Sequence, residues 1–553
     1  MFSYLLSPIY YLRFSNNGFQ GMIALLMLLQ IQSPLSVRSD TLRLEHDALD
    51  YDIQLSLPDT GTHITAQVQT KWRVGSSEPI HLELDPKLVV VRVLMDGLYQ
   101  ERLTRTLYGK SDGLVLIPHQ RQAGDTMSTA IRYHGWPRDG FVISTNAQGE
   151  RTMFGDNWPD RAHYWLPVQD TPADKATATW HVEVPPGMKV IANGAFLKVD
   201  TLAYGRTVWH YRISEPVPVY TFVVGVAPFA VTDLIPAACS IKCVPMSVWT
   251  YRADSAYAVN GPFRRAPDMV DYFSKTFGPF PFERLSHVES TTRYGGMENS
   301  TAIFYPAKAY AEKKVSEETV AHETAHQWFG DAVTEGDWHH VWLSEGFATY
   351  LAALWVGHAD GDSAFRRLMQ QNAKEATTDN PVIDQPIVNP AIRNIDSVLS
   401  NNTYPKAAWA LHTLRGLMGD SAFFAGMREY YRKYRDGNAL SSDFADVMSK
   451  AAGKDVSWFL QQALTQPGYA KLSIEWKWDK KKLALTIRQT QPEAWGTFTL
   501  RGLVVRVDGV DHRIDVEGRE SVANIGGLKS KPAKIEVDPG SWWLMQATVG
   551  EVP

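Results

Sequence analysis

The sequence has few cysteines and no strong excess of either charge. Its two cysteines, Cys239 and Cys243, are too few for a disulfide scaffold and lack the further ligands of a structural zinc site. Their spacing permits one small disulfide, which would indicate an oxidising compartment, or two free thiols. A net charge of −5 and 21% charged residues argue against nucleic acid as a partner. No internal repeat or low-complexity tract is present.

The sequence also lacks a clear transmembrane run near its start. The apolar stretch at residues 21–31 is too short to span a bilayer. Arg13 precedes it, and Val37 and Ser39 are compact residues at the two positions that matter for cleavage, so residues 1–39 are predicted to be a signal peptide. We therefore expect export to the periplasm or the medium. An uncleaved N-terminal anchor is the alternative, and no other membrane association is expected.

The length of 553 residues predicts three or four domains. Apolar residues alternate with period two through much of residues 40–233, which predicts an N-terminal antiparallel β domain. Helical periodicity is prominent in residues 234–466. Alternation returns in residues 467–553 and predicts a C-terminal β-sandwich. The expected fold class is therefore multidomain α+β.

The densest chemical signal is the run from Val320 to Gly330. Ser316 is a predicted helix cap, and a helix beyond it places His322 and His326 on one face, one turn apart. Two imidazoles in this arrangement can bind Zn²⁺, with Glu323 beside them for proton transfer. Two buried histidines that only make core hydrogen bonds are the plain alternative.

Glu345 makes the zinc hypothesis specific. It follows His326 with eighteen residues between them, near the start of another amphipathic helix. Two histidines and one carboxylate with an open fourth position are typical of a catalytic zinc site. We therefore predict one Zn²⁺ per chain, held by His322, His326 and Glu345.

A second motif, Tyr294-Gly295-Gly296-Met297-Glu298-Asn299, lies upstream. Together with the zinc motif it resembles the gluzincin aminopeptidases, which include aminopeptidase N, aminopeptidase B and the leukotriene hydrolase. Their usual string is Gly-(Ala/Gly)-Met-Glu-Asn, and the resemblance covers nearly all of the chain after residue 40. It implies a thermolysin-like, mainly helical catalytic domain. Many members continue into a large helical domain, so this short form is expected to have a more open cleft.

The resemblance implies roles for individual residues. Glu323 would be the general base and acid, and Tyr404 would stabilise the oxyanion. Glu298 would bind the free α-ammonium of a peptide. Ala407 departs from the family's Tyr-x-Lys-Gly pattern. The predicted substrate-binding residues are Glu298, Gly295, Gly296, Met297, Asn299 and Asp156.

Three of these predictions leave alternatives open. Gly295 and Gly296 suit a strand edge that pairs with an extended peptide, or a plain turn. Asp156 could support the amine site or select lysine and arginine as the first residue. Asp331 could orient a zinc-bound histidine, or lie solvated near a helix end.

The sequence therefore predicts a zinc-dependent aminopeptidase that hydrolyses the N-terminal residue of peptides with a zinc-activated water. The runner-up is a zinc endopeptidase of the thermolysin type, in which Glu298 would have no charged partner. A non-catalytic peptide-binding scaffold is the third hypothesis.

Overall fold

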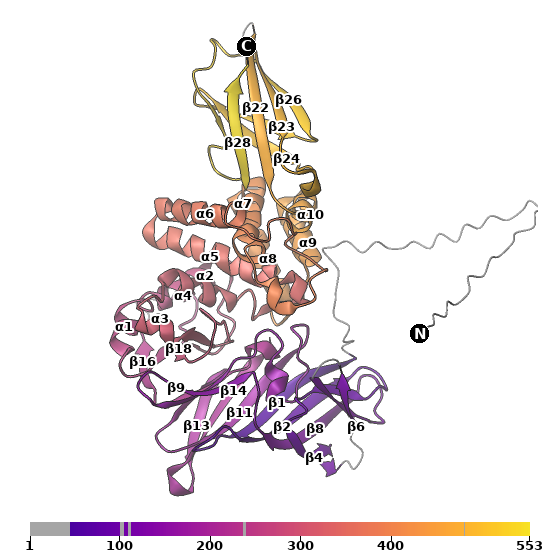
Figure 1. The fold of residues 1–553 in the computed structure, drawn as a ribbon, viewed down its shortest axis with the longest axis vertical. Helices are drawn as coiled ribbons and strands as arrows, with labels where there is room; N and C mark the ends of the chain where they lie inside the picture. The colour runs from indigo at the N-terminus through magenta and orange to yellow at the C-terminus, as the bar shows by residue number, and fades with distance from the viewer. Residues whose placement is uncertain (1–44, 100–103, 109–111, 236–238, 480–481, 553) are drawn as a thin grey trace, which may run out of the picture.

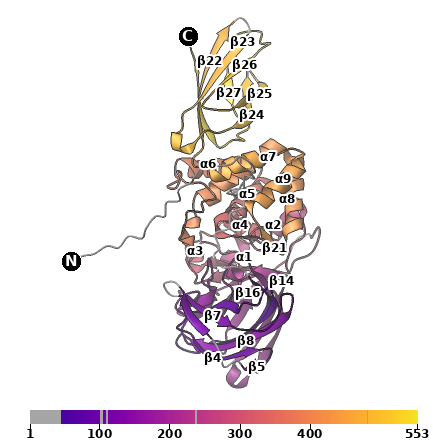
Figure 2. The same cartoon turned by 90° about the vertical axis from the view of Figure 1, so that its right-hand side faces the viewer.

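The computed structural model describes residues 45–99, 104–108, 112–235, 239–479 and 482–552. They form three tiers along the longest axis (Figure 1), and Figure 2 shows the same order from the side. A β domain lies at one end, a helical domain in the middle and a second β domain at the other end. The predicted α+β class is confirmed. The predicted signal peptide at 1–39 lies outside the described residues.

The first tier is dominated by an eight-stranded sheet with the order β13-β14-β11-β1-β2-β8-β4-β5. Its strands are β1 (His46–Ser56), β2 (Ile64–Val74), β4 (Val89–Met95), β5 (Leu98–Tyr99), β8 (Thr126–Gly135), β11 (Lys175–Val184), β13 (Ala195–Thr201) and β14 (Thr207–Pro218). Ile64, Ala66 and Val68 are buried, as the period-two pattern predicts. The expected antiparallel arrangement has one exception, because β1 and β11 pair in parallel.

Two smaller sheets complete this domain, with the orders β12-β15-β10-β9 and β3-β7-β6. Their strands are β3 (Ile80–Glu83), β6 (Thr104–Tyr108), β7 (Asp112–Ile117), β9 (Phe141–Thr145), β10 (Arg151–Gly155), β12 (Lys189–Ala192) and β15 (Val224–Ala227). Large aromatic side chains fill the space between the sheets: Trp165 and Trp180 are fully buried and stack with ring centroids 6.2 Å apart.

The middle tier begins with the sheet β16-β17-β18-β19. Its strands are β16 (Ala230–Leu234), β17 (Met246–Thr250), β18 (Leu285–Ser290) and β19 (Ala302–Pro306). The predicted domain boundary between residues 233 and 234 falls inside β16. Since β16 pairs with β17 along its whole length, the strand belongs to the sheet of the middle tier.

Helices make up most of this tier. They are α1 (Ser255–Asn260), α2 (Ala266–Phe277), α3 (Ala307–Ala311), α4 (Glu317–His326), α5 (Trp342–Asp360), α6 (Asp362–Thr377), α7 (Ala407–Met418), α8 (Asp420–Tyr434), α9 (Ser441–Ala452) and α10 (Ser457–Thr465). The predicted cap of α4 is confirmed, because the Ser316 hydroxyl accepts a hydrogen bond from the Thr319 amide at 3.0 Å. Two short strands, β20 (Val333–Glu335) and β21 (Gly437–Ala439), pair in parallel beside the helices.

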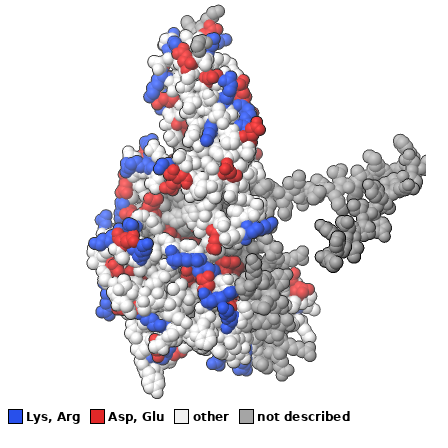
Figure 3. Space-filling model, in the orientation of Figure 1, with Lys and Arg blue, Asp and Glu red and all other residues white. Residues whose placement is uncertain are grey.

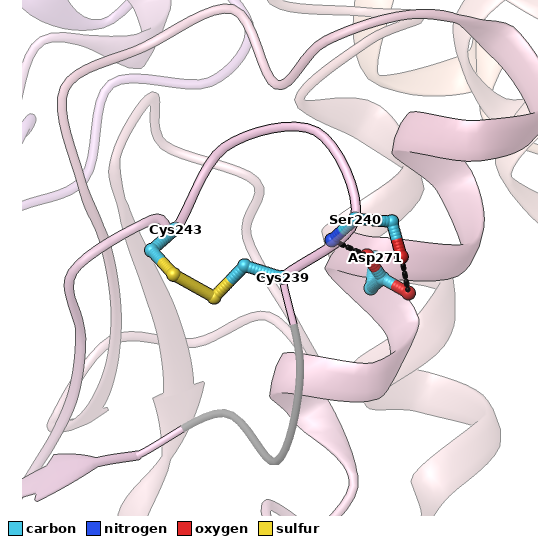
Figure 4. The surroundings of a disulfide bond; sticks show 4 residues. All are labelled: Cys239, Ser240, Cys243 and Asp271. Carbon is cyan, nitrogen blue, oxygen red and sulfur yellow. Dashed lines mark hydrogen bonds between the residues drawn. A yellow bond between two sulfur atoms is a disulfide. The ribbon is translucent and has the colours of Figure 1, made fainter.

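The two cysteines are joined by a disulfide in the loop between β16 and β17 (Figure 4). The next residue, Ser240, donates from its amide and its hydroxyl to the two carboxylate oxygens of Asp271 on α2, at 2.8 and 3.1 Å. Of the two alternatives left by the sequence, this structure has the bridged form. The bridge closes the loop on itself, and the two hydrogen bonds of Ser240 hold the loop against α2.

The last tier contains two sheets, β26-β23-β22-β28 and β25-β24-β27, around a separate apolar core. Their strands are β22 (Ala470–Asp479), β23 (Lys482–Gln489), β24 (Leu500–Val507), β25 (Val510–Val516), β26 (Glu520–Ile525), β27 (Ile535–Val537) and β28 (Met545–Glu551). Acidic and basic side chains are interspersed over the face shown in Figure 3. No helix among the described residues has both the length and the apolar character needed to cross a bilayer.

Candidate metal centre and active-site cleft

Helices α4 and α5 bring three metal-ligand side chains together. The Nε2 atoms of His322 and His326 lie 3.1 Å apart, and each lies 3.2 Å from Oε2 of Glu345. The helical repeat places the two histidines on one face of α4, and Glu345 comes from the first turn of α5. The three predicted ligands therefore form one cluster.

The donor set fits a zinc ion. Ligand atoms at about 2.0–2.2 Å from a tetrahedral zinc are separated by roughly 3.4 Å, close to the spacing here. His326 Nδ1 lies 3.0 Å from the Ser344 hydroxyl and 3.2 Å from the Phe329 carbonyl. A proton on Nδ1 directed at these oxygens leaves the lone pair of Nε2 facing the cluster. A cation between the three groups would relieve the repulsion between their lone pairs.

Glu323 is fixed beside the cluster by close packing against Gly296. It is only 6% exposed. A Cβ atom on Gly296 would lie 2.0 Å from Glu323 Oε1, whereas a Cβ on Gly295 would have no heavy atom within 4 Å. The second glycine of the motif therefore makes room for the carboxylate. Gly295 meets no such steric limit.

Glu298 lies close to both Glu323 and His326. One carboxylate oxygen of Glu298, one of Glu323 and a ring nitrogen of His326 all lie within 4.8 Å of one another. Burial raises the pKa of Glu298, and it raises the pKa of Glu323 well above its usual range. A cationic ligand between these acids would be favoured electrostatically.

A network of hydrogen bonds holds the Glu298 segment against α4. The side-chain Nε2 of Gln327 donates to the backbone carbonyl of Glu298 at 2.9 Å and to Asp331 Oδ2 at 2.7 Å. The side-chain Oε1 of Gln327 accepts from the Thr301 backbone amide at 2.9 Å. Thr301 has a φ of 68°, an uncommon conformation for a β-branched residue. Gln327 thus connects the end of α4 to both ends of the loop 298–301.

Tyr404 reaches the metal cluster from a short π-helical turn, η7 (Asn402–Lys406), which precedes α7. Its hydroxyl donates to Glu345 Oε1 at 2.8 Å. The turn contains Pro405, and π-helical turns are often found at functional sites. Ala407 packs closely against Gly346, whose added Cβ would lie 2.5 Å from the alanine Cβ.

These side chains line a cavity of about 500 Å³. Its walls are formed by Tyr294, Gly295, Gly296, Glu298, Glu318, Thr319, His322, Glu323, His326, Glu345, Thr349, Ala352, Asn372, Glu375, Ser400, Asn401, Tyr404 and Pro405. No lysine or arginine is among these described wall residues. Eight of the predicted site residues are in the wall, whereas Met297, Asn299 and Asp156 are not.

Met297 and Asn299 are buried behind the wall, where Met297 exchanges two backbone hydrogen bonds of 2.9 Å with Phe304 of β19. The segment after the two glycines therefore extends the sheet at the β19 edge. Asp156 is buried and accepts from the Arg161 guanidinium at 2.7 Å. Its carboxylate already has a cationic partner within the chain.

Asp331 differs from both of its predicted roles. It is fully buried, so the prediction of a solvated side chain is wrong. Its carboxylate interacts with Gln327 and Ser300, while the ring of His326 faces Phe329 and Ser344. Asp331 therefore acts on the site through Gln327 and the Glu298 loop.

Comparison with known families is consistent with this geometry. Residues 263–462 match the model described as "Peptidase family M1 domain". This segment is a peptidase family M1 domain. It contains both histidines, Glu345, Glu323, Glu298 and Tyr404, and the resemblance to the gluzincin aminopeptidases is confirmed.

Several known proteins are similar to this chain over more than residues 263–462. Human endoplasmic reticulum aminopeptidase 1 is 26% identical over 427 residues, which are 71% of this chain and 44% of the relative. A crystal structure of an M1 zinc metallopeptidase from Deinococcus radiodurans covers 76% of this chain and 94% of its own, with 23% identity and a TM-score of 0.67. A crystal structure of Legionella pneumophila aminopeptidase A covers 92% of this chain and 60% of its own, with 15% identity and a TM-score of 0.79. The chain spans about half the length of the curated relatives it matches.

Sequence reasoning missed several wall and support residues of the M1 domain. Gln327 directly follows His326, but its three partners lie in a loop and a turn that no local pattern connects. Glu318 precedes His322 by one helical turn, which could have placed it on the same face. Asn372 and Glu375 come from α6, and only the tertiary fold brings them to the cleft.

Proposed function

We propose that this protein is a zinc-dependent aminopeptidase that removes the N-terminal residue of peptides. The observation that carries the proposal is the position of Glu298, whose carboxylate lies beside Glu323 and the His322–His326–Glu345 cluster. An acid at this place gives a free α-ammonium a partner and so fixes the scissile bond one residue from the end.

The chain's own residues supply the remaining chemistry. When bound by His322, His326 and Glu345, zinc contributes Lewis acidity, which polarises the substrate carbonyl and lowers the pKa of water to about 7. Glu323 accepts the proton of the attacking water and delivers it to the leaving nitrogen. Tyr404 keeps its proton and donates a hydrogen bond from its hydroxyl to the carbonyl oxygen that becomes negative.

Metal content provides a direct test of the ligand set. We expect one zinc per chain in the purified protein and little in the Glu345→Ala variant, which keeps only two protein ligands. The matched control is Glu318→Ala, which removes an acid from the same cavity but leaves the three ligands. Full zinc occupancy in Glu345→Ala would contradict the assignment.

The amine-binding role is tested with blocked and free peptides. N-terminal acetylation removes the charge that Glu298 pairs with, and such a bond contributes about 1.5–3 kcal/mol. Hydrolysis should therefore fall by at least about tenfold. Glu298→Ala should lose activity on free-amine peptides and most of the discrimination against acetylated ones. Equal cleavage of both substrates by the wild type would favour the endopeptidase, and absence of turnover in the zinc-loaded protein would favour the binding scaffold.

We further propose that the protein is exported and acts on peptides outside the cytoplasm. The Cys239–Cys243 bridge supports this, because disulfides persist mainly in oxidising compartments. Cell fractionation tests the location. Recovery in the membrane fraction would favour the uncleaved anchor, and recovery in the cytosol would overturn export.

A further inference from the structure

The cleft extends beyond the metal centre toward a second group of acidic and amide side chains. Glu318 comes from the first turn of α4, whereas Asn372 and Glu375 lie one turn apart on α6. All three line the same cavity as His322 and Glu323. The mechanism above does not use them.

Two observations indicate that a ligand belongs at this position. Asn372 is only 5% exposed, and its side-chain nitrogen has no hydrogen-bond partner among the described residues. A buried amide donor of this kind is costly unless a ligand supplies an acceptor. Burial raises the pKa of Glu318, and the neighbouring charge of Glu375 raises it further. The two carboxylates are thus close enough to repel each other, and no described salt bridge neutralises either one.

The order of groups along α4 gives the direction of a bound peptide. Glu298 is fastened to Gln327, at the end of α4. Glu318 precedes His322 by four residues, or about 6 Å along the axis at 1.5 Å per residue. With its ammonium group at Glu298 and its first carbonyl at the metal centre, a peptide continues toward Glu318. Its second side chain then faces the acid pair.

We propose that Glu318, Glu375 and Asn372 form a subsite that selects lysine or arginine as the residue directly after the scissile bond. The carboxylates pair with the cationic end of that side chain, and the Asn372 amide donates to a substrate carbonyl. The inference rests on the proposed aminopeptidase function. It adds a substrate class, namely peptides with a basic second residue.

The test compares kcat/KM for Leu-Lys-Ala with Leu-norleucine-Ala, which keeps the aliphatic chain and lacks the charge. We expect the lysine peptide to be preferred by about tenfold at low salt, and the preference to shrink as salt screens the partly exposed pair. In the double variant Glu318→Gln/Glu375→Gln the ratio should approach one. The control Asp362→Asn removes an exposed acid from the same helix α6 and should keep the ratio of the wild type.

Binding separates this inference from the function on which it rests. Calorimetry with zinc-loaded Glu323→Gln protein measures the affinity for both peptides without turnover. Tighter binding of the lysine peptide that disappears when Glu318→Gln and Glu375→Gln are added to the Glu323→Gln protein supports the subsite even if hydrolysis proves to be of another kind. Equal affinities and equal kcat/KM for the two peptides would overturn the subsite while leaving an active aminopeptidase in place.

Discussion

At the scale of single residues, Gly296 sets the position of the general base. Its substitution by alanine would force the Glu323 carboxylate to move, because the new Cβ would lie 2.0 Å from Oε1. A displacement of about 1 Å at a catalytic group can cost about 100-fold in rate. We therefore expect Gly296→Ala to retain zinc and to lose about 100-fold in kcat. Gly295→Ala is the matched control, and a similar loss there would contradict the steric explanation.

Lys406 presents a different single-residue effect, on stability. It is 5% exposed, its Nζ has no hydrogen-bond partner among the described residues, and burial lowers its pKa to about 7. An unfolded lysine keeps its proton up to a pH of about 10.4. Unfolding therefore takes up a proton between these two pH values, and this residue makes the folded state more stable as the pH rises through that window.

Replacing Lys406 by methionine should remove this pH dependence. Relative to the wild type, the variant should be more stable at pH 7, and the advantage should shrink by at most about 1.4 kcal/mol per pH unit up to pH 9. Urea denaturation at several pH values measures the difference. An advantage that did not change with pH would show that Lys406 is not neutralised on folding.

At the scale of elements, the loop that carries Glu298 depends on α4 for its position. Gln327→Leu would remove three hydrogen bonds to this loop and to Asp331. Glu298 would be held less firmly, so we expect KM for free-amine peptides to rise about tenfold, with a smaller change in kcat and full zinc content. Gln370→Leu, an exposed glutamine on α6, is the control. A fall in kcat without a rise in KM would instead indicate that Gln327 supports proton transfer and not the binding of the ammonium group.

The same loop is also fastened from the first tier. The Asn193 side chain donates to the Ser300 carbonyl and the Gly194 amide donates to the Thr301 hydroxyl, both at 2.7 Å. The amine-binding residue is therefore positioned by two domains. The first domain thus helps to position Glu298 in the active-site cleft.

At the scale of the whole molecule, Lys175 joins the first and middle tiers. Its ammonium group donates to the carbonyl oxygens of Ala332 and Gly437 at 2.8 and 3.0 Å. Lys175→Met removes both of these hydrogen bonds between the tiers, although the Ala332 carbonyl still accepts from the Asp436 amide at 2.7 Å. We expect a loss of about 1.5–3 kcal/mol, seen as a first thermal transition lowered by several degrees. Lys71→Met on the exposed face of β2 serves as the control. If Lys175→Met and Lys71→Met had the same first transition temperature, the hydrogen bonds of Lys175 would not hold the tiers together.

Local patterns predicted the metal cluster because its ligands lie on two adjacent helices whose periodicity fixes their faces. The period-two strands and the class of each tier followed from the same reasoning. Contacts between distant segments could not be predicted in this way. The buried environment of Asp331, the internal partner of Asp156 and the parallel β1–β11 pair all depend on tertiary neighbours.

The parallel pairing of β1 with β11 has a consequence for the order in which the chain can fold. In the large sheet β1 lies between β2 and β11, and Asp50 pairs with Thr177. One edge of β1 can pair with β2, the next strand along the chain. The other edge has to wait for β11, which the ribosome makes more than a hundred residues later. Contacts of such long sequence separation form slowly. The large sheet of the first domain therefore stays incomplete during much of its own synthesis, and the free edge of β1 remains open to other partners until β11 arrives.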